Sequence, residues 1–418
     1  MKVLVLGGGG REHAICWKLS QSPLVEKIFC IPGNAGIEKI ASCVDLSWEK
    51  DFSSLIEFVR KEKVDFTIVG PEAPLVNGVV DEFEKEGFKI FGPTREAARL
   101  EGSKVWAKKF MKKYGIPTAE FETFSDLDKA LNYIDQQEHS VVVKADGLAG
   151  GKGSLVTQSK DEAEDAVRKI LEKKVFGSAG KRIVIEKRLK GKELSFFVIT
   201  DGNTAKSLVS SRDYKPLYEN NRGPNTGGMG AYSPASLKPP LFKKIMKKIV
   251  IPTLRGLRNE GIVYRGVLYV GLMIEEGEPK VLEYNCRFGD PETQVTLPRL
   301  YTDLMEVFLC AQAGRLETIN LKWRSQAATC VVLASKGYPG NYEKGKIIKG
   351  IEEAERLKNV FVFCAGVKRE NDNLITNGGR VIGVCGMGKN LKESAETAYR
   401  GVSKIDFEGM YHRKDIGG

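Results

Sequence analysis

Short apolar blocks that end in glycine or proline recur through the first hundred residues. KVLVL (2–6) runs into GGGGREHA, and comparable blocks end in PGNAG, VGPEAPL and FGPT. After the first block, Ile15 and Leu19 keep the apolar spacing of a helix face. The recurring order of strand, tight turn and helix predicts a parallel sheet with crossover helices over residues 1–103.

The next part of the pattern predicts a smaller mixed unit. A helix is expected at 103–114, because Gly115 and Pro117 would end it. Strands flank the glycine-rich stretch KADGLAGGKG, a polar helix is expected at 159–174, and KRIVIEKRL and KELSFFVITDG have the composition of strands. These elements predict a compact α+β unit at about 118–190.

Residues 204–235 contain few periodic apolar positions and many Gly, Pro and Asn residues. This composition predicts a long irregular segment, of a kind that is usually functional or mobile. A helix at 241–260 and a hairpin then lead to KVLEYNCRFGDPETQ (280–294), and a strand-rich unit is predicted from about 327. The expected fold class is therefore a multidomain chain with α/β and α+β parts.

Composition narrows the class of protein. The chain has 418 residues, of which 42% are apolar, so it can form several ordinary cores. No apolar run approaches the roughly 18–20 residues of a membrane span. The N-terminus lacks the apolar core of a signal peptide, so we expect a cytoplasmic protein. Eight cysteines without a CxxC pair, and only three histidines, argue against a structural zinc site.

The net charge is +11, from 65 basic and 54 acidic residues. The densest basic runs, KKFMKKYG (108–115) and KKIMKKI (243–249), have the spacing of helices with one solvated face, and we interpret them as exposed. Nucleic-acid-binding proteins cluster basic and aromatic residues, a pattern that this chain lacks. The remaining positive charge favours a small polyanionic ligand.

GGGGREHA resembles a dinucleotide-binding turn but departs from it. The last glycine of GxGxxG is replaced by Glu12, and IFCIPGN ends without the acid that would hold a ribose. Two interpretations stay open: a helix N-terminus that binds an anion, to which Arg11 and His13 could contribute, and a tight structural turn.

KADGLAGGKG (144–153) carries four glycines after Lys144, which ends the preceding strand. The GxxxxGK[ST] pattern of a Walker loop is absent. Small residues allow a backbone to approach phosphates closely and to fold over them as a lid. The alternative is a flexible hairpin turn, for which four glycines would be many.

EYNCRFGDPETQ gathers polar groups at a strand end. Glu283 and Asn285 would share one strand face, and their oxygens are hard ligands suited to Mg²⁺; a solvated polar face is the alternative. Arg287 has the same parity and could bind a carboxylate or phosphate. Asp290 and Glu292 either take part in the chemistry or only favour a helix start. Metal-assisted nucleotide chemistry is predicted, without the Ser-His-Asp or Cys-His arrangement of covalent catalysis.

These motifs, together with LEGSK (100–104), GPNTGGMGAYSP (223–234) and RKDIG (413–417), resemble those of the phosphoribosylamine–glycine ligase family of ATP-grasp enzymes. The resemblance implies an N-terminal α/β domain at 1–103, an ATP-grasp domain at 104–326 with a lid subdomain at about 118–190, and a C-terminal domain at 327–418.

The resemblance also implies an activity: ATP-dependent ligation of glycine to 5-phosphoribosylamine through glycyl phosphate. The products are glycinamide ribonucleotide, ADP and phosphate, and the reaction is the second step of purine synthesis. It implies small-molecule partners, neither nucleic acid nor membrane, and a monomer or weak homodimer. Two alternatives are another ATP-grasp ligase of purine synthesis and a nucleotide-binding or nucleic-acid-binding module without catalysis.

Site residues follow from the same resemblance. Arg287 and Asp213 are expected to bind glycine, and Glu283 and Asn285 to hold Mg²⁺ or Mn²⁺. The residues expected to bind ATP are Lys104, Lys144, Gly150, Gly151, Gly153, Glu186, Leu189 and Glu193. Those expected around phosphoribosylamine are Gly9, Gly10, Pro71, Glu72, Asn225, Thr226, Gly228, Met229, Gly230, Arg380 and Arg413.

Two departures from the family pattern are visible. Gly271 stands where many ATP-grasp ligases have a further metal-binding carboxylate, so metal binding is expected to depend also on phosphate and water oxygens. In SRDYKPLYENNRGPNT (211–226), Asp213 and Lys215 match the family, whereas Tyr214, Pro216, Asn221 and Arg222 do not.

Overall fold

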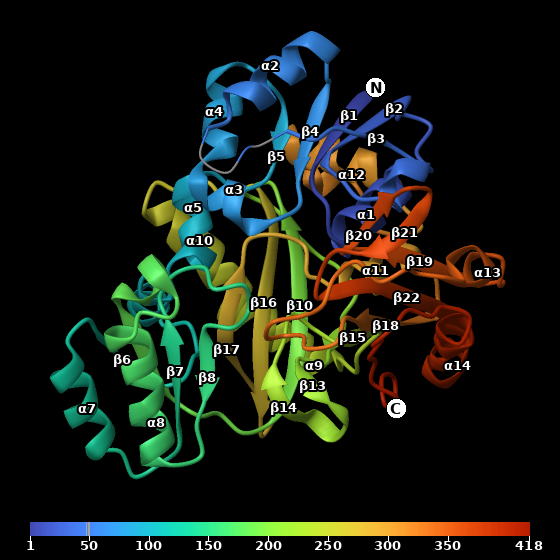
Figure 1. The fold of residues 1–418 in the computed structure, drawn as a ribbon. Coiled ribbons are helices and arrows are strands. Elements are labelled where there is room, and N and C mark those ends of the chain that lie inside the picture. The colour runs from blue at the N-terminus through green and yellow to red at the C-terminus, as the bar shows by residue number, and fades with distance from the viewer. Residues whose placement is uncertain (47, 49–50) are drawn as a thin grey trace.

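The computed structural model describes residues 1–46, 48 and 51–418, and its N-terminal part is a parallel sheet with the strand order β3-β2-β1-β4-β5 (Figure 1). Its strands are β1 (Lys2–Gly7), β2 (Lys27–Pro32), β3 (Ser42–Cys43), β4 (Phe66–Val69) and β5 (Ile90–Phe91). Its helices are α1 (Gly10–Leu19), α2 (Ser53–Glu62), α3 (Glu72–Asn77), α4 (Val79–Lys85) and α5 (Arg95–Gly102). Parallel neighbours need crossover connections, and the helices supply them, as the apolar pattern predicts.

The glycine-rich stretch belongs to a separate antiparallel sheet with the order β6-β9-β7-β8. Its strands are β6 (Phe121–Phe124), β7 (Val141–Ala145), β8 (Ser154–Val156) and β9 (Ile183–Lys187). Helices α7 (Leu127–Asp135) and α8 (Lys160–Val167) pack on it and enclose a core of their own, which includes Ile134, Val143 and Ile185. We call this sheet with its two helices the antiparallel unit. It matches the α+β elements expected there.

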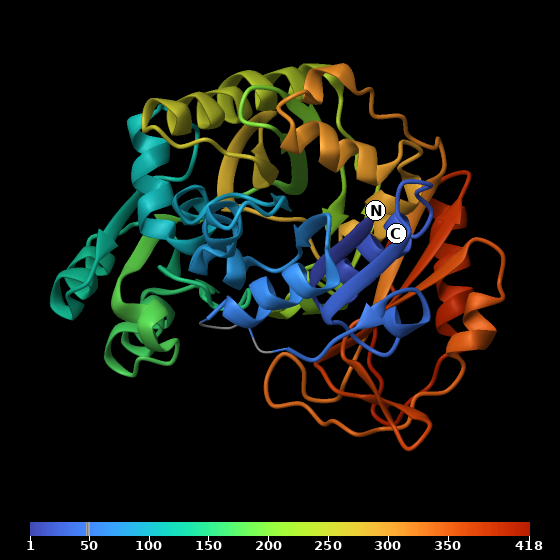
Figure 2. The ribbon, with the colours of Figure 1, turned by 90° about the horizontal axis from the view of Figure 1, so that it is seen from above.

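A long antiparallel sheet with the order β11-β10-β16-β17 occupies the centre of the molecule (Figure 1). Its strands are β10 (Lys192–Thr200), β11 (Ala205–Ser207), β16 (Gly266–Glu275) and β17 (Glu278–Asn285). The helices of this region are α6 (Lys104–Lys113), α9 (Pro239–Ile245), α10 (Ile251–Asn259), α11 (Thr293–Thr296) and α12 (Leu304–Gln312). Figure 2 shows the antiparallel unit and the C-terminal strands on opposite sides of these central strands.

The last sheet has the order β12-β15-β18-β22-β19 and combines two distant parts of the chain. Its strands are β12 (Arg212–Asp213), β15 (Gly230–Ser233), β18 (Ala327–Ala334), β19 (Val360–Cys364) and β22 (Arg380–Gly388). Two hairpins, β13 (Pro216–Tyr218) with β14 (Arg222–Asn225) and β20 (Val367–Glu370) with β21 (Asn373–Thr376), project nearby, and the helices are α13 (Ile351–Glu355) and α14 (Leu391–Val402).

The segment 204–235 is therefore more ordered than its sequence suggests. We expected irregular chain there, but it forms β11 to β15, and β15 pairs with β18 from Gly230↔Val331 to Ser233↔Ala328. These strands are short and carry few apolar residues, so they are defined by their hydrogen-bonded neighbours rather than by a local pattern: β11 pairs with β10, β12 with β15, β13 with β14, and β15 also with β18. Among the described residues, none of the helices is long and apolar enough to cross a membrane.

Candidate functional site

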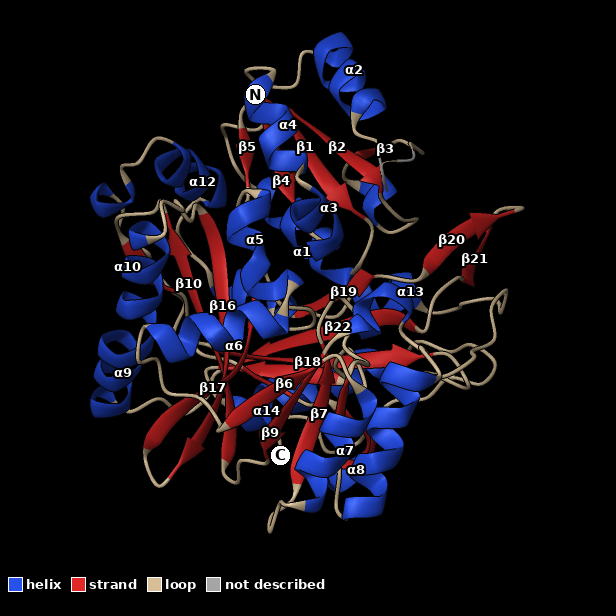
Figure 3. Ribbon diagram, turned by 90° about the vertical axis from the view of Figure 1, so that its left-hand side faces the viewer, coloured by secondary structure: helices blue, strands red, loops and turns tan. Residues whose placement is uncertain are grey.

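A cavity of about 820 Å³ lies where the four sheets meet. Helices α5 and α6, which lead into it, run between the N-terminal sheet and the antiparallel unit (Figure 3). Its lining includes many residues expected to act together, from every part of the chain: Glu72, Lys104, Lys144, Gly150, Gly151, Gly153, Glu186, Leu189, Glu193, Asp213, Asn225, Thr226, Glu283, Asn285, Arg287 and Arg380.

One end of the cavity is lined by lysines held in place by buried polar groups. Lys104 is the first residue of α6, and burial lowers its pKa. The helix begins there because Ser103 is its N-cap, whose hydroxyl accepts a 3.1 Å hydrogen bond from the Trp106 amide. Oδ1 of Asp146 supports this cap by accepting hydrogen bonds from the Ser103 hydroxyl (2.7 Å) and the Val105 amide (2.8 Å). Asp146 belongs to the glycine-rich stretch, so this contact ties the start of α6 to the loop that would cover a ligand.

Lys108 corrects the interpretation of KKFMKKYG as a solvated run. Lys109, Lys112 and Lys113 are exposed, but Lys108 is only 2% exposed and lines the cavity. Burial lowers its pKa to about 8, against the attraction of Glu186. The sequence does carry a signal, because Lys104 and Lys108 are one helical turn apart and share a face.

The tip of the glycine-rich loop requires glycine. Gly150 and Gly151 have φ values of 56° and 77°, in the left-handed region where side chains are disfavoured. A Cβ on Gly151 would lie 3.6 Å from the carbonyl oxygen of Thr226. The loop tip therefore lies against the 226–229 loop between β14 and β15, so both loops border the same space.

Glu283 and Asn285 lie side by side on β17 and both line the cavity, as strand parity predicts. Burial alone would keep the Glu283 carboxyl neutral, but Lys215, Lys144 and Lys104 together lower its pKa to about 2. Within the described chain, no group of three or more His, Cys, Asp or Glu residues could hold a metal ion. One carboxylate and one amide oxygen suit a magnesium ion that arrives on nucleotide phosphates.

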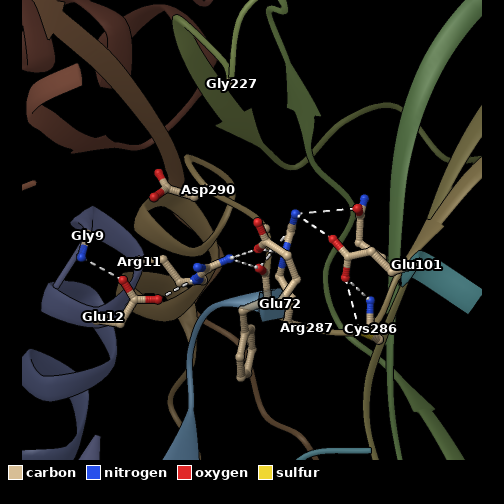
Figure 4. A network of polar contacts seen from close by, with 12 residues as sticks. Gly9, Arg11, Glu12, Glu72, Glu101, Gly227, Cys286, Arg287 and Asp290 are labelled. Carbon is tan, nitrogen blue, oxygen red and sulfur yellow. Dashed lines mark hydrogen bonds and ion pairs between the residues drawn. The ribbon is translucent and has the colours of Figure 1, made fainter. Parts of the chain in front are cut away.

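Arg287 lies between two carboxylates from the N-terminal region (Figure 4). Its Nε is 3.1 Å from Oε2 of Glu72, and its Nη2 is 3.0 Å from Oε1 of Glu101 and 3.3 Å from Oδ1 of Asn285. Glu101 also accepts a hydrogen bond of 2.7 Å from the amide of Cys286. Despite burial, these two carboxylates raise the pKa of Arg287, so a fixed cation faces the cavity.

Asp213, the last residue of β12, and Lys215, in the link between β12 and β13, both line the same cavity. Burial raises the pKa of Asp213 to about 7, while Lys215 opposes this shift. The ammonium of Lys215 lies 3.4 Å from Oε1 of Glu283. Asp213 is therefore an acid that can gain or lose a proton near neutral pH beside an ionised carboxylate.

Comparison with known proteins identifies the family in which this combination of domains occurs. Models of phosphoribosylglycinamide synthetase match the chain in order: the N domain at 1–101, the ATP-grasp (A) domain at 102–293 and the C domain at 328–418. The phosphoribosylamine–glycine ligase of Caldanaerobacter subterraneus subsp. tengcongensis is 50% identical over 420 residues, covering 100% of this chain and 99% of that protein. The chain belongs to the phosphoribosylglycinamide synthetase family.

Further members of the family agree along the whole length. The ligase of Haemophilus influenzae is 48% identical over 421 residues, which cover 100% of this chain and 98% of that protein. The crystal structure of the Thermotoga maritima ligase has a TM-score of 0.86 and 37% identity, and the match covers 99% of this chain and 100% of that chain. The chain is thus an ATP-grasp ligase of purine synthesis, and the expected fold class and family are confirmed.

The N-terminus of α1 is occupied by a side chain of the protein, that of Glu12. Oε2 of Glu12 accepts a hydrogen bond of 2.6 Å from the Gly9 amide, and its side chain fills the space beside Gly7 and Gly70 (Figure 4). That space is where a dinucleotide fold would admit a pyrophosphate. Glu12 also holds Arg11, whose Nη1 donates a hydrogen bond of 3.0 Å to the Phe288 carbonyl.

His13 does not reach the cavity. Its Nδ1 accepts a 2.8 Å hydrogen bond from the Cys364 amide, and burial lowers its pKa to about 4. Among the described residues that line the cavity, several of those expected around phosphoribosylamine are missing: Gly9, Gly10, Pro71, Gly228, Met229 and Gly230. Met229 is fully buried against Leu217 and Ala334.

Arg413 is likewise away from the cavity. Its side chain is fully buried, forms two contacts of 2.7 and 2.6 Å with Asp415 and donates a 2.9 Å hydrogen bond to the Pro216 carbonyl. Its guanidinium also lies 4.8 Å from the centre of the Tyr214 ring. The C-terminal motif therefore anchors the β13–β14 hairpin from behind. Arg413 thus contacts Tyr214 and Pro216, two of the residues that depart from the family pattern.

Asp290 and Glu292 both line the cavity, but each also orders its neighbours. The Asp290 carboxylate accepts a 2.7 Å hydrogen bond from Gln294 and lies 3.4 Å from Nη1 of Arg380. Arg380 in turn donates a 2.8 Å hydrogen bond to the Gly227 carbonyl. Oε1 of Glu292 accepts a 3.1 Å hydrogen bond from Ser195. Asp290 and Glu292 therefore both hold neighbouring residues in place, which is the structural alternative that the sequence left open.

Proposed function

We propose that this cavity joins glycine to 5-phosphoribosylamine with ATP as the energy source, and that the residues expected from sequence carry the roles given below. The observation that supports this most directly is the convergence of Lys104, Lys144, Glu283, Asn285 and Arg287 on one cavity. Phosphoryl transfer from ATP needs cations around the phosphates, and a carboxylate acceptor needs a cation of its own.

ATP is proposed to lie with its phosphates against Lys104 and Lys144. The backbone at 186–189 would receive adenine, Glu193 would bind the ribose hydroxyls, and the loop at 150–153 would cover the phosphates. Glu283 and Asn285 would hold Mg²⁺ or Mn²⁺. When bound, the divalent ion neutralises charge on the phosphate oxygens.

Glycine is proposed to bind through both of its charges. Arg287 pairs with the carboxylate, and Asp213, once ionised, pairs with the ammonium. A carboxylate oxygen attacks the γ-phosphorus, the bond to ADP breaks, and glycyl phosphate forms. The amine of phosphoribosylamine then attacks the acyl carbon and releases phosphate. Negative charge develops in both steps, where the lysines and Arg287 can stabilise it.

Phosphoribosylamine is proposed to enter from the side of the 226–229 loop, where the cavity is lined by Glu72, Asn225, Thr226 and Arg380. Because the glycine-rich loop lies against Thr226, closure over ATP also limits water at the acyl centre. Glycyl phosphate would otherwise be hydrolysed, so this closure serves the second step.

We also propose three properties of the whole protein. The division into domains at 103 and 326 is supported by the family segments at 1–101, 102–293 and 328–418. A cytoplasmic location suits small-molecule chemistry of this kind. A monomer or weak homodimer is expected in solution, without nucleic-acid or membrane partners.

The deciding experiment is ADP release with each substrate omitted in turn. Release should require glycine, and stoichiometric formation of glycinamide ribonucleotide should also require freshly made phosphoribosylamine. Full activity with another amino acid or another amine in place of these would indicate a different ATP-grasp ligase and would overturn the proposal.

A further inference from the structure

Three charged side chains form a buried cluster at the nucleotide end of the cavity. Glu186 lies between Lys108 and Lys144, and the side chains of these three residues are no more than 5% exposed. Oε1 of Glu186 is 2.6 Å from Nζ of Lys144, and its other oxygen forms an ion pair with Lys108. A single carboxylate is therefore shared by two ammonium groups, and the cluster keeps one net positive charge.

The two lysines are anchored differently. Nζ of Lys144 also donates a hydrogen bond of 3.0 Å to the Leu282 carbonyl, and it has one N–H left for a ligand. Nζ of Lys108 donates a 2.6 Å hydrogen bond to the Thr118 hydroxyl, which itself donates to the Val281 carbonyl at 2.7 Å. Lys108 is thus fixed between Glu186 and Thr118, and Lys144 between Glu186 and the Leu282 carbonyl, so each ammonium keeps one further N–H.

We propose that Lys108 is a positioning residue for ATP: by balancing Glu186, it leaves the charge of Lys144 available to the polyphosphate. This inference rests on the proposed role of Lys144 as a phosphate ligand. Without Lys108, the carboxylate would pair with Lys144 alone and the cluster would become neutral. Lys108 need not touch the nucleotide for this effect, because the change in charge occurs within a low-dielectric site.

The ionisation of the carboxylate is consistent with this arrangement. Burial alone would raise the pKa of Glu186, but Lys144 and Lys108 lower it, so the group stays charged. A carboxylate shared by two lysines in a dry site has no solvent to compensate for the loss of either partner.

The test measures binding of ADP and AMP by calorimetry to the full chain, with Mg²⁺ present and without glycine. Lys108→Met should weaken ADP binding about tenfold or more and change AMP binding far less, since the missing charge acts on the outer phosphates. Lys109→Met, an exposed neighbour on the same helix, is the matched control and should bind both nucleotides normally.

A charge-restoring variant separates this role from a purely structural one. Lys108→Met combined with Glu186→Gln returns the cluster to one positive charge, and ADP affinity should recover most of the loss. If the double variant binds ADP as weakly as Lys108→Met, the inference is overturned. If Lys108→Met fails to fold, Glu186→Gln alone decides, because the added positive charge should tighten ADP binding; unchanged or weaker binding contradicts the inference.

Lys144→Met separates a failure of the proposed role of Lys144 as a phosphate ligand from a failure of the inference about Lys108. If Lys144→Met leaves ADP binding unchanged, the proposed function of Lys144 fails. If it weakens ADP binding while Lys108→Met does not, Lys144 keeps its role and the inference about Lys108 fails alone.

Discussion

Nη2 of Arg287 lies 3.0 Å from the carboxylate of Glu101, so a residue of α5 fixes the guanidinium proposed to bind glycine. Glu101→Gln should raise the KM for glycine about tenfold or more, because only Glu72 would still balance the guanidinium. The KM for ATP should change little. Steady-state kinetics with each substrate varied in turn measures the difference.

Glu96→Gln provides the control for Glu101. Glu96 lies on the same helix and pairs with Arg99, but both side chains are largely exposed. Exposed pairs of this kind contribute about 0–1 kcal/mol, so neither KM should change. Equal effects on the KM of glycine and of ATP in Glu101→Gln would contradict a specific role in orienting Arg287.

Glu283→Ala should reduce turnover by at least about 10²-fold while the fold is retained. The pKa of about 2 means that this carboxylate is ionised at neutral pH and able to bind a cation. Its loss would leave Lys215, Lys104 and Lys144 without their shared counter-charge. ADP release and thermal unfolding of the same preparation check both parts. Near-normal ADP release would exclude Glu283 as a metal ligand.

The pKa of Asp213, raised by burial from 3.8 to about 7, predicts a pH dependence of glycine use. Only the ionised carboxylate can pair with an ammonium. Below pH 7, kcat/KM for glycine should therefore rise about tenfold per pH unit and then level off. Asp213→Asn should lower this parameter and remove the inflection. A profile of the same shape in Asp213→Asn would assign the inflection to another group.

The raised pKa of Asp213 affects stability in the opposite direction: glycine use should increase with pH, whereas the free energy of unfolding should decrease. Between about pH 4 and 7, Asp213 binds a proton in the folded chain but not in the unfolded chain, so its contribution to stability falls as pH rises. In Asp213→Asn this contribution is absent. Urea unfolding at pH 5 and pH 8 should show a smaller loss of stability at pH 8 in the variant than in the original chain.

Gly151→Ala should uncouple ATP use from product formation. A side chain at φ +77 costs about 1–2 kcal/mol, so the conformation that places the loop against Thr226 becomes less populated. More glycyl phosphate should then be lost to water, and the ratio of ADP to glycinamide ribonucleotide should exceed one. Gly177→Ala is the control: its φ is 55°, in the same antiparallel unit, but it lies outside the cavity lining among the described residues.

Arg380 and Arg413 should give opposite patterns when each is changed to Met. Arg380 lines the cavity, so Arg380→Met should raise the KM for phosphoribosylamine about tenfold or more. Arg413 is fully buried and donates hydrogen bonds to the partly exposed Asp415 and to the Pro216 carbonyl, so Arg413→Met should lower the free energy of unfolding by about 1.5–3 kcal/mol. If Arg413→Met raised the KM for phosphoribosylamine more than Arg380→Met, Arg413 would be assigned to the substrate site.

Much of the site could be predicted because its residues are local in sequence. Glu283 and Asn285 need only strand parity to share a face, and Gly150 and Gly151 need only the conformational freedom of glycine. The parallel N-terminal sheet follows from apolar blocks that end in turns. These predictions depend on neighbours within a few residues, which a sequence displays directly.

What the sequence could not supply are contacts made across the fold. Glu101 reaches Arg287 and Cys286 only after α5 packs beside the end of β17, and Glu186 comes between two lysines only when β9 pairs with β7. Lys108 looked like one more solvated lysine because its buried partner lies far along the chain. The contacts of Arg413 with the β13–β14 hairpin could not be predicted either, because nothing local indicates that hairpin.

The pairing of β15 with β18 has a consequence for the independence of the C-terminal region. A chain cut after residue 326 would leave β15, still paired with β12 on one side, as an exposed sheet edge whose backbone groups facing β18 are unpaired. It would also lose Arg380, which holds the Gly227 carbonyl. The C-terminal region is therefore not an interchangeable module. A chain truncated in this way should self-associate through the edge of β15.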